Sequence, residues 1–523
     1  MKRQNIIWTL LAAIAVLSSC ESYLDELPDD RATLDTEEKI TRFLVSCYAT
    51  RNNAFVQEYS SDNMVYNGDT YTTQVNQEQL WKFEDVTTQG NDDPRSLWND
   101  YYFAVASANE ALAAIDRIGN PASMKGQRAE ALLCRAWAMF RLGTLFCMAY
   151  NPDIEYMGLP YPKVMGQEIV ERGTLNELYD NINADIEEAL PNISDNHLDI
   201  PKYHFNRKAA YAFAARFNLY YLKFEKAIRY ATEAIGEDPS SLLRNWAEME
   251  SMGNAEIGVA YVNAGNPANL MLHSAFSLIG RAPYSSNYRR YGYGQVARNF
   301  ELFYPEAPWG YGPKDYTSLI MASKQYGSAP NYRVPKMVEF FEYTDKAGNS
   351  GKAHVIDAAF TADETLLVRA EAYALTKNYD MALRDMNYWI DSHCRKNAYF
   401  VVLTKEIVEN FMSALEVAPR KPETDNDRSI RKALHPQGFT VESGTQEYFI
   451  QLILHMRRLE TVQQGLRFND IKRYGIEYSH EIPNGEPLEF YTADPRGAIQ
   501  IPTDVIEAGM TPNPRDIPKP SAE

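Results

Sequence analysis

The sequence lacks the cysteine patterns of a disulfide-stabilised or zinc-binding protein. Only five of its 523 residues are cysteine, and no two of them form a Cys-x-x-Cys pair. Cys134 and Cys147 fall in one predicted helix, roughly 20 Å apart at 1.5 Å per residue, which is beyond the reach of a disulfide. We therefore predict that the four cysteines after Cys20 are buried free thiols, and we find no motif for a metal ion or a cofactor.

Motifs of the common enzyme classes are also missing. The chain has no His-Glu-x-x-His, no Gly-x-Ser-x-Gly and no phosphate-binding glycine loop, and its eight histidines are scattered. These absences argue against a metalloprotease, a serine hydrolase or a nucleotide-dependent enzyme, so we predict no enzymatic activity. Seventy acidic residues supply many carboxylate pairs, so a helical glycosidase stays as the enzyme alternative.

Positive charge is scarce. The chain carries 52 lysines and arginines against 70 acidic residues, a net charge of −18. Binding to nucleic-acid phosphates needs clustered cations, so nucleic acid is excluded as a partner class. An anionic membrane surface is disfavoured for the same reason, and the charge favours solubility.

A long apolar run occurs once, at the N-terminus. Residues 6–17 are apolar except for Thr9 and follow two positive residues, but about 12 residues cannot span a bilayer of about 30 Å. We predict an export signal over residues 1–19. The run Leu17-Ser18-Ser19-Cys20 resembles the lipobox of bacterial lipoproteins, which implies lipid attachment at Cys20; the alternative is an ordinary signal peptide with a chance cysteine. Residues 20–36 are acidic and contain proline, as expected of a tether.

Helical periodicity is the main pattern in the rest of the chain. It predicts helices over 98–118, 127–150 and 174–190, the last beginning with a capping box of Thr174 and Glu177. Residues 207–237 and 363–392 each predict two antiparallel helices.

The two helix pairs repeat a pattern of small residues. Ala215, Ala227 and Ala234 in the first pair, and Ala370 and Ala382 in the second, stand where two helices of a tetratricopeptide unit press together. A degenerate unit is expected within 103–150, so three units can stack and bury their faces on one another.

The fold class is therefore mostly α, with tetratricopeptide-like helical repeats and a large irregular insertion. We predict one domain over 37–523, with repeat helices near 103–150, 207–237 and 363–392. The insertion, 240–362, is rich in glycine, proline and tyrosine, and must carry short elements of its own. Residues 416–445 and the tail from 477 are also predicted to be irregular.

Several blocks along the chain form an ordered set. Besides Cys20, they are Glu130–Leu142, Gly158–Pro162, Asp185–Pro191, Leu367–Tyr373 and, most specifically, Arg457–Glu460 with Gly465–Gly475. Together these blocks resemble the SusD/RagB family of outer-membrane nutrient-binding lipoproteins of Bacteroidetes. Met456 and Gln464 depart from this pattern, because glutamates are usual at both positions.

The C-terminal block is interpreted as structural. Its charged residues fall three to seven apart on a helix and are predicted to form an ion-pair network with buried members. The predicted members are Arg458, Glu460, Arg467, Asp470 and Arg473.

The resemblance implies capture and not catalysis. Family members sit on the outer membrane through their lipid, bind an oligosaccharide or a peptide, and deliver it to a SusC-like TonB-dependent transporter. Ligand residues vary in the family, so none can be carried over to this chain.

The aromatic residues supply the ligand-site candidates. Thirty-five tyrosines are unusual, and flat aromatic faces suit sugar rings. Residues 281–316 form the first candidate platform and parts of 62–102 the second; the alternative is that these rings fill the core of a loop subdomain. Arg289 and Arg290 could instead bind an acidic sugar or a peptide carboxylate. The candidates are Tyr284, Tyr288, Arg289, Arg290, Tyr291, Tyr293, Trp309, Tyr311 and Tyr316, with Asp69, Trp81 and Trp98.

Three functions remain open from the sequence. The favoured one is a surface lipoprotein that captures an oligosaccharide or polysaccharide. The others are a peptide-binding member of the same family and a helical-repeat scaffold that binds a protein without an enzymatic role.

Overall fold

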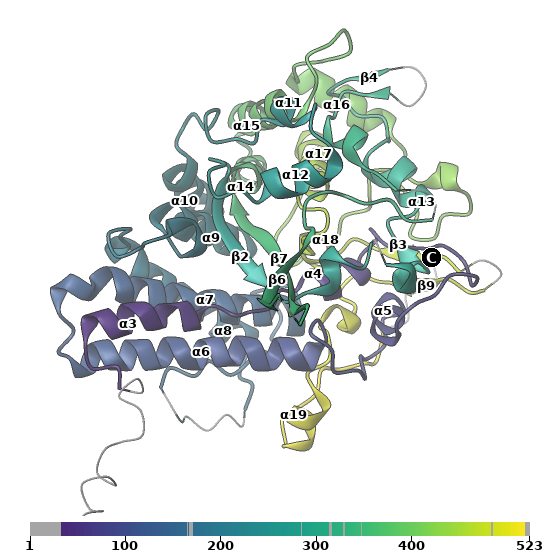
Figure 1. The fold of residues 1–523 in the computed structure, drawn as a ribbon. Coiled ribbons are helices and arrows are strands. Elements are labelled where there is room, and N and C mark those ends of the chain that lie inside the picture. Colours follow the sequence, from purple (N-terminus) through teal and green to yellow (C-terminus); the bar gives the residue numbers. More distant parts are fainter. Residues whose placement is uncertain are drawn as a thin grey trace, which may run out of the picture.

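The computed structural model describes residues 33–517, apart from 165, 167–170, 284, 313–315, 328–329, 347 and 483–484. The predicted signal peptide, Cys20, most of the tether and Tyr284 lie outside the described residues. The described chain is mostly helical, as predicted, and most of its strands are short (Figure 1).

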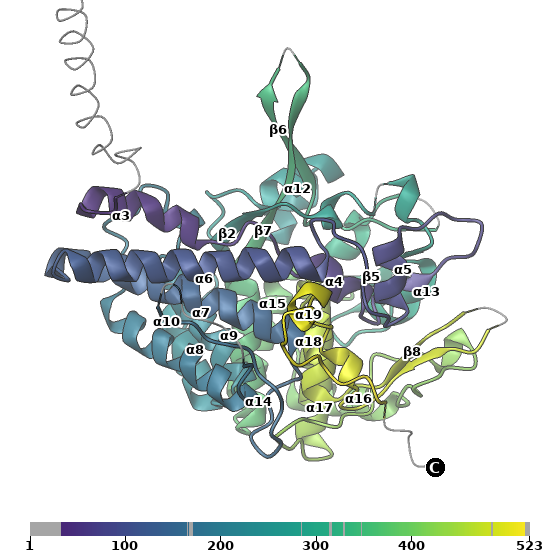
Figure 2. The ribbon, with the colours of Figure 1, turned by 90° about the horizontal axis from the view of Figure 1, so that it is seen from below.

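Long antiparallel helices form one side of the molecule (Figure 2). Helix α6 (Pro94–Arg117) packs on α7 (Lys125–Phe146), which packs in turn on α8 (Leu175–Ala189), while α3 (Glu37–Phe43) lies against α6. Proline at the first position of α6 suits a helix start, because that position needs no hydrogen-bond donor. The capping box that begins α8 is present, with Glu177 N 3.1 Å from Thr174 Oγ1.

The two predicted repeat pairs form and stack on each other. Helices α9 (Arg207–Tyr220) and α10 (Phe224–Ile235) make the first pair, and α14 (Ala362–Leu375) and α15 (Tyr379–His393) the second. Each turn between paired helices contains a left-handed residue, Leu222 with φ 60° and Lys377 with φ 62°. Helix α10 packs on α14, so the pairs lie side by side although the insertion separates them in sequence.

The insertion carries a small sheet that the sequence did not predict. Its antiparallel order is β2-β7-β6, built from β2 (Asn269–Ala275), β6 (Glu339–Asp345) and β7 (Ser350–Thr361). Strand β2 is buried on both faces and so shows no alternation of apolar and polar residues. Strand β7 runs directly into α14, which ties the insertion to the second repeat pair, and the β6–β7 hairpin projects from the body (Figure 2). The insertion also holds α11 (Trp246–Met249), α12 (Asn254–Tyr261), α13 (Gln295–Ala297), β4 (Tyr311–Gly312) and β5 (Tyr316–Thr317).

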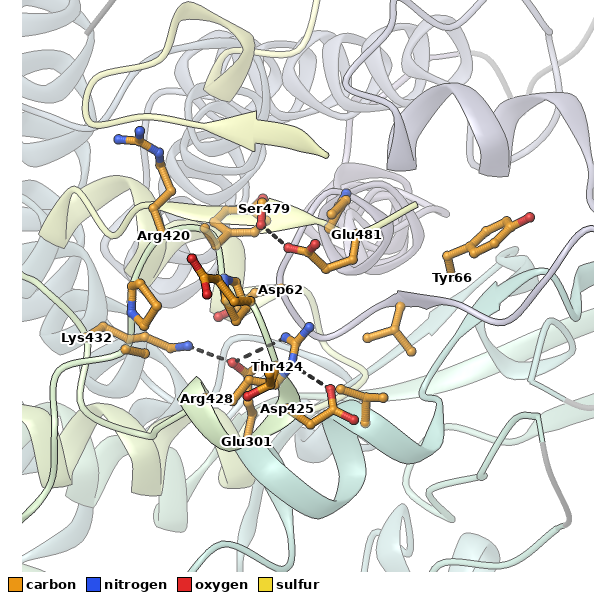
Figure 3. Close-up of a pocket in the computed structure, with 18 of the residues that line it drawn as sticks. Asp62, Tyr66, Glu301, Arg420, Thr424, Asp425, Arg428, Lys432, Ser479 and Glu481 are labelled. Atoms are coloured by element: carbon orange, nitrogen blue, oxygen red, sulfur yellow. Dashed lines mark hydrogen bonds and ion pairs between the residues drawn. The ribbon is translucent and has the colours of Figure 1, made fainter. Parts of the chain in front are cut away.

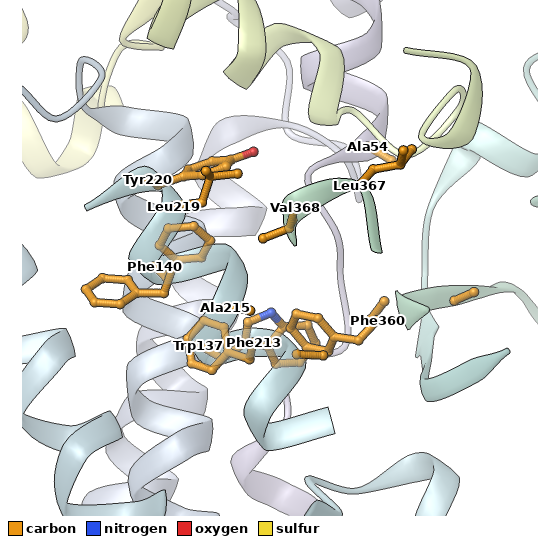
Figure 4. Packing of buried hydrophobic residues seen from close by; sticks show 14 of the residues in the cluster. Ala54, Trp137, Phe140, Phe213, Ala215, Leu219, Tyr220, Phe360, Leu367 and Val368 are labelled. Carbon is orange, nitrogen blue, oxygen red and sulfur yellow. The ribbon is translucent and has the colours of Figure 1, made fainter. Parts of the chain in front are cut away.

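One hydrophobic core joins the helices to the sheet (Figure 4). The Phe213 ring of α9 lies 5.8 Å from both Phe140 of α7 and Phe360 of β7, measured between centroids. Each fully buried aromatic of this kind contributes about 1.5–3 kcal/mol by leaving water. The predicted free thiols are confirmed for the described chain: Cys47, Cys134, Cys147 and Cys394 are unpaired and buried.

The C-terminal part packs against the second repeat pair and the N-terminal residues. Helix α17 (Thr445–Glu460) lies on α14, and α18 (Leu466–Tyr474) contacts α4 (Ala54–Tyr59). Gly465 begins α18 with φ 80°, and a Cβ there would lie 2.9 Å from Gln57 Cβ, so this close approach needs glycine. Helices α16 (Lys405–Ala414) and α19 (Thr503–Glu507) and strands β8 (Tyr478–His480) and β9 (Leu488–Phe490) complete this part.

Candidate ligand-binding cavity

A cavity of about 290 Å³ opens where three distant segments meet (Figure 3). The segments are residues 62–66, which include β1 (Val65–Tyr66), the loop over 418–432, and β8 with Glu481. Val296 and Glu301 of the insertion close it from a fourth side. The cavity therefore exists only in the folded chain.

Buried ion pairs form the floor of the cavity. The Asp62 carboxylate accepts two hydrogen bonds from Arg467, at 2.8 and 2.7 Å, and lies 3.3 Å from Arg458 Nη2. Glu301 accepts from Lys432 Nζ at 2.6 Å and from Arg458 Nη2 at 3.3 Å. Such pairs survive burial because several donors satisfy each carboxylate.

The floor carboxylates are held in their ionised form. Burial alone would raise the pKa of Asp62, but the charges of Arg458 and Arg467 outweigh it and hold that pKa well below its usual value. Burial likewise opposes ionisation of Glu301, and the charges of Lys432 and Arg458 lower its pKa. A general acid needs a pKa near the working pH, so neither group suits acid catalysis near neutrality.

The rim supplies partly exposed polar groups. Arg420 donates to Glu477 at 2.9 Å and also pairs with Glu489 on β9, so its guanidinium is fixed in place. Arg428 donates to Asp425 at 3.3 Å, and the Ser479 hydroxyl donates to Glu481 (Figure 3). These groups can donate to and accept from the hydroxyls of a ligand.

A stack of rings backs the wall of the cavity. Strand β1 pairs with β3 (Tyr291–Gly292), so the two candidate regions from the sequence do meet, at Tyr66 and Tyr291. The Trp81 ring of α5 (Val75–Trp81) stacks on Tyr291 at 4.5 Å and on His480 at 4.6 Å. Tyr66 is the partly exposed ring of this group and lines the cavity, where burial and the neighbouring Asp69 raise its pKa to about 12.

The structure corrects the expected stacking platform at five positions. Tyr291, Tyr293, Trp81, Trp98 and Trp309 are all buried, none more than 7% exposed. Each has ring or hydrogen-bond partners inside the protein: Trp309 stacks on His455 at 5.8 Å, Tyr293 donates to Glu58 at 2.9 Å, and Trp98 packs on Phe146. These rings fill the core, the alternative that the sequence left open.

The other candidates lie nearer the surface. Arg289 and Asp69 are exposed, and Tyr288 is half-buried against Phe55. Arg290 donates to the Tyr71 and Asp69 carbonyls, at 2.9 and 3.3 Å, and so braces the loop after β1. The backbone of Tyr311 and Tyr316 forms β4 and β5; their side chains are outside the described part of the structure.

The predicted ion-pair network is present as three separate clusters. Arg458 and Arg467 belong to the cavity floor with Asp62. Asp470 and Arg473 join Arg457 and Glu371 between α18, α17 and α14. Glu460 accepts hydrogen bonds from Trp389 and His393, both at 3.0 Å, and lies 3.9 Å from Lys336. Partners from other elements separate the predicted residues into these clusters, and helical spacing alone could not predict those partners.

Sequence reasoning missed most of the residues that line the cavity. Most come from segments predicted only as irregular, 416–445 and the tail from 477, where no motif marked them, and Glu301 comes from the insertion. Runs of proline and acidic residues in 419–427 were the one available signal. The missed residues are Glu301, Arg420, Arg428, Lys432, Ser479 and Glu481.

Comparisons with known proteins show what the chain is similar to. Residues 22–219 match the family model described as "Starch-binding associating with outer membrane". SusD-like protein P38 of Formosa agariphila is 26% identical over 258 residues, which cover 47% of this chain and 48% of that protein. The match thus spans about half the length of this curated relative.

Solved structures show the same fold over nearly the whole chain. A putative sugar-binding protein from Bacteroides vulgatus is 17% identical with a TM-score of 0.62, covering 92% of this chain and 98% of that one. A laminarin-binding SusD-like protein is 15% identical with a TM-score of 0.54, covering 91% and 97%. The match over residues 22–219 and the shared fold confirm that this chain is similar to SusD-like proteins, as its sequence blocks suggested.

The helices offer no transmembrane segment. Among the residues that the structure describes, none of the helices combines the length and apolar character needed to cross a bilayer.

Proposed function

We propose that this protein captures a neutral oligosaccharide or polysaccharide in the cavity and passes it to a partner TonB-dependent transporter of the outer membrane. In this proposal a lipid on Cys20 anchors the chain to that membrane at the cell surface. The cavity of ionised and hydroxyl groups beside Tyr66 carries the proposal, because such groups exchange hydrogen bonds with sugar hydroxyls. The family's description as starch-binding and the laminarin-binding relative support it.

The charge of the lining favours a neutral ligand. Five carboxylates and three cations line the cavity, and Arg458 and Arg467 beneath it balance the remaining negative charge. Burial lowers the pKa of His480 to about 4, so this ring is uncharged near neutrality. The cavity therefore has no excess of positive charge that would favour sulfated sugars or uronates.

The state of the two buried carboxylates of the cavity supports binding without catalysis. Asp62 and Glu301 are tied to cations that hold them ionised, so they cannot act as the proton donor of a glycosidase near neutral pH. We therefore infer that the ligand leaves the protein chemically unchanged.

Calorimetry with a panel of ligands tests the function. The chain lacking residues 1–20 is titrated with laminarin, starch, xylan and galactomannan, with alginate and heparin as acidic polymers, and with peptides. We expect saturable binding to a neutral polysaccharide, weakened by Tyr66→Ala and by Glu481→Gln. Phe103→Ala is the control, because this ring is 67% exposed on α6 and does not line the cavity.

Other outcomes identify the alternatives. Binding to peptides with no response to any polysaccharide would establish the peptide-binding function instead. No response to either class would leave the scaffold, and binding to a polysaccharide that both cavity variants leave unchanged would move the site elsewhere.

A further inference from the structure

A second cavity adjoins the first. It has a volume of about 410 Å³ and shares one lining residue, Arg428, with the cavity described above. Its other lining residues come from the insertion, over 299–306, and from Leu415 and the segment 429–430. The insertion and the segment 415–432 thus contribute to both cavities, and the Arg428 side chain lines both.

A π-helical turn forms the wall common to both cavities. This turn, Arg298–Leu302 (η7), follows α13 directly. It places Glu301 in the first cavity, against Lys432, and Asn299 and Phe300 in the second. Single π-turns are rare and are frequently found at functional sites.

The second cavity differs from the first in chemistry. Phe300 and Tyr304 are half-buried, and Leu415 adds an aliphatic surface beside them. The Tyr304 ring is held in place, because Arg298 lies 4.1 Å from its centroid and its hydroxyl donates to Ala322 O at 3.0 Å. Fixed aromatic rings suit the apolar face of a sugar ring, while the first cavity suits the hydroxyls.

Arg428 is placed to contact a ligand that occupies both cavities. Its Nε donates to Asp425 at 3.3 Å and its Nη1 lies 3.9 Å from Glu301, while the side chain keeps 13% of its surface exposed. A guanidinium has five N–H donors, so donors remain for oxygen atoms of a ligand passing over it.

We propose that the two cavities are adjoining subsites of one elongated groove, divided by Arg428, and that the ligand is a linear neutral oligosaccharide with units in both. This proposal rests on the proposed function and specifies its ligand as a chain longer than one or two sugars. The first cavity binds by hydrogen bonds and the second by aromatic contact with Phe300.

The dependence of affinity on chain length tests the proposal. Size-fractionated oligosaccharides are prepared from the neutral polysaccharide that binds most tightly in the panel, and each length is titrated by calorimetry. We expect affinity to rise about tenfold once the chain is long enough to enter both cavities, which corresponds to about 1.4 kcal/mol.

Variants in the second cavity remove that rise. Phe300→Ala is expected to weaken binding of the long oligosaccharides about tenfold and to leave the shortest binding fragment unchanged. Ser429→Trp fills the same cavity without removing a core side chain and is expected to give the same selective loss. Phe103→Ala again serves as the exposed aromatic control.

Different results would contradict the second subsite and the proposed function. If neither variant alters the length profile, or if both weaken short and long fragments equally, the second subsite is wrong while carbohydrate capture stands. If the unaltered protein binds no oligosaccharide of any length, both the proposed function and the groove are wrong.

Discussion

Individual charged residues beneath the cavity stay ionised because each has counter-charges at hydrogen-bond distance. Arg458 contacts both floor carboxylates, Asp62 at 3.3 Å and Glu301 at 3.3 Å. Removing one member of such a buried set costs more than the set itself contributes, because the remaining charges lose their compensation.

Replacing Arg458 by methionine is expected to destabilise the protein strongly. Arg458→Met leaves two buried carboxylates undercompensated, so the free energy of unfolding should fall by about 3–5 kcal/mol in a urea titration. The matched control is Arg207→Met. The Arg207 side chain is 52% exposed and that of its partner Glu233 is 49% exposed, so the free energy of unfolding should fall by less than about 1 kcal/mol. Equal losses in the two variants would contradict the buried network.

Asp92 links stability to pH. Burial raises its pKa to about 7. The hydrogen bonds that Asp92 accepts from the Ser277 hydroxyl and from Leu278 N, the latter at 2.7 Å, lower the pKa but do not outweigh burial. The pKa of this carboxyl is higher in the folded protein than the ordinary value of 3.8. Its contribution to stability is therefore fully present below pH 3.8 and is lost as the pH rises through 7.

The Asp92→Asn variant exposes this dependence. The free energy of unfolding of the unaltered protein, minus that of the variant, should fall between pH 4 and pH 8, by about 4 kcal/mol at most. Urea unfolding of both proteins across this range measures the difference. A difference that stays constant with pH would show that Asp92 does not titrate there.

Pairs of short elements set the shape of the cavity wall. Strand β1 is held by β3 and by the loop that Arg290 braces. Gly294 comes shortly after β3 in the chain and packs against β1. A Cβ at Gly294 would lie 2.4 Å from Val65 Cγ2 and 2.5 Å from Asn67 Oδ1, so any larger residue must displace the wall.

Gly294→Ala is expected to weaken ligand binding as well as the fold. The φ of this residue is −80°, so the effect is steric and not a backbone strain. We expect a loss of about 1–3 kcal/mol in stability and a measurable loss of affinity by calorimetry. Gly253→Ala is the control, since its nearest neighbour would lie 3.5 Å away. Unchanged affinity in Gly294→Ala would place the ligand away from β1.

The molecule as a whole is strongly acidic, and the charges of its cavity are paired. The net charge of −18 should repel polyanions at a distance, and the cations of the cavity, which are paired with carboxylates, should attract them little. Binding of a neutral sugar gains nothing from charge and should therefore be insensitive to screening.

Salt titration distinguishes these cases. Affinity for the neutral polysaccharide is expected to change less than about twofold between 50 and 500 mM NaCl, and heparin should not compete at either concentration. Calorimetry at the two salt concentrations measures both. A steep loss of affinity with salt would instead indicate an acidic ligand held by Arg289 and Arg290.

Local sequence determined the helices, their caps and the repeat pairs. The capping box at Thr174 and the small residues Ala215, Ala227 and Ala234 act through neighbours a few residues away, so spacing alone revealed them. The sheet β2-β7-β6 was not predicted, because strand β2 is buried on both faces and so has no alternating pattern of apolar and polar residues.

Only the tertiary structure decided which aromatic residues line the cavity and where the cavity lies. Trp309 and Tyr66 look equally suited in sequence, but the first is 1% exposed against His455 while the second lines the cavity. The floor joins Asp62 to Arg458 and Arg467, nearly 400 residues along the chain. Burial and long-range pairing depend on how distant elements pack, and no local pattern records that packing.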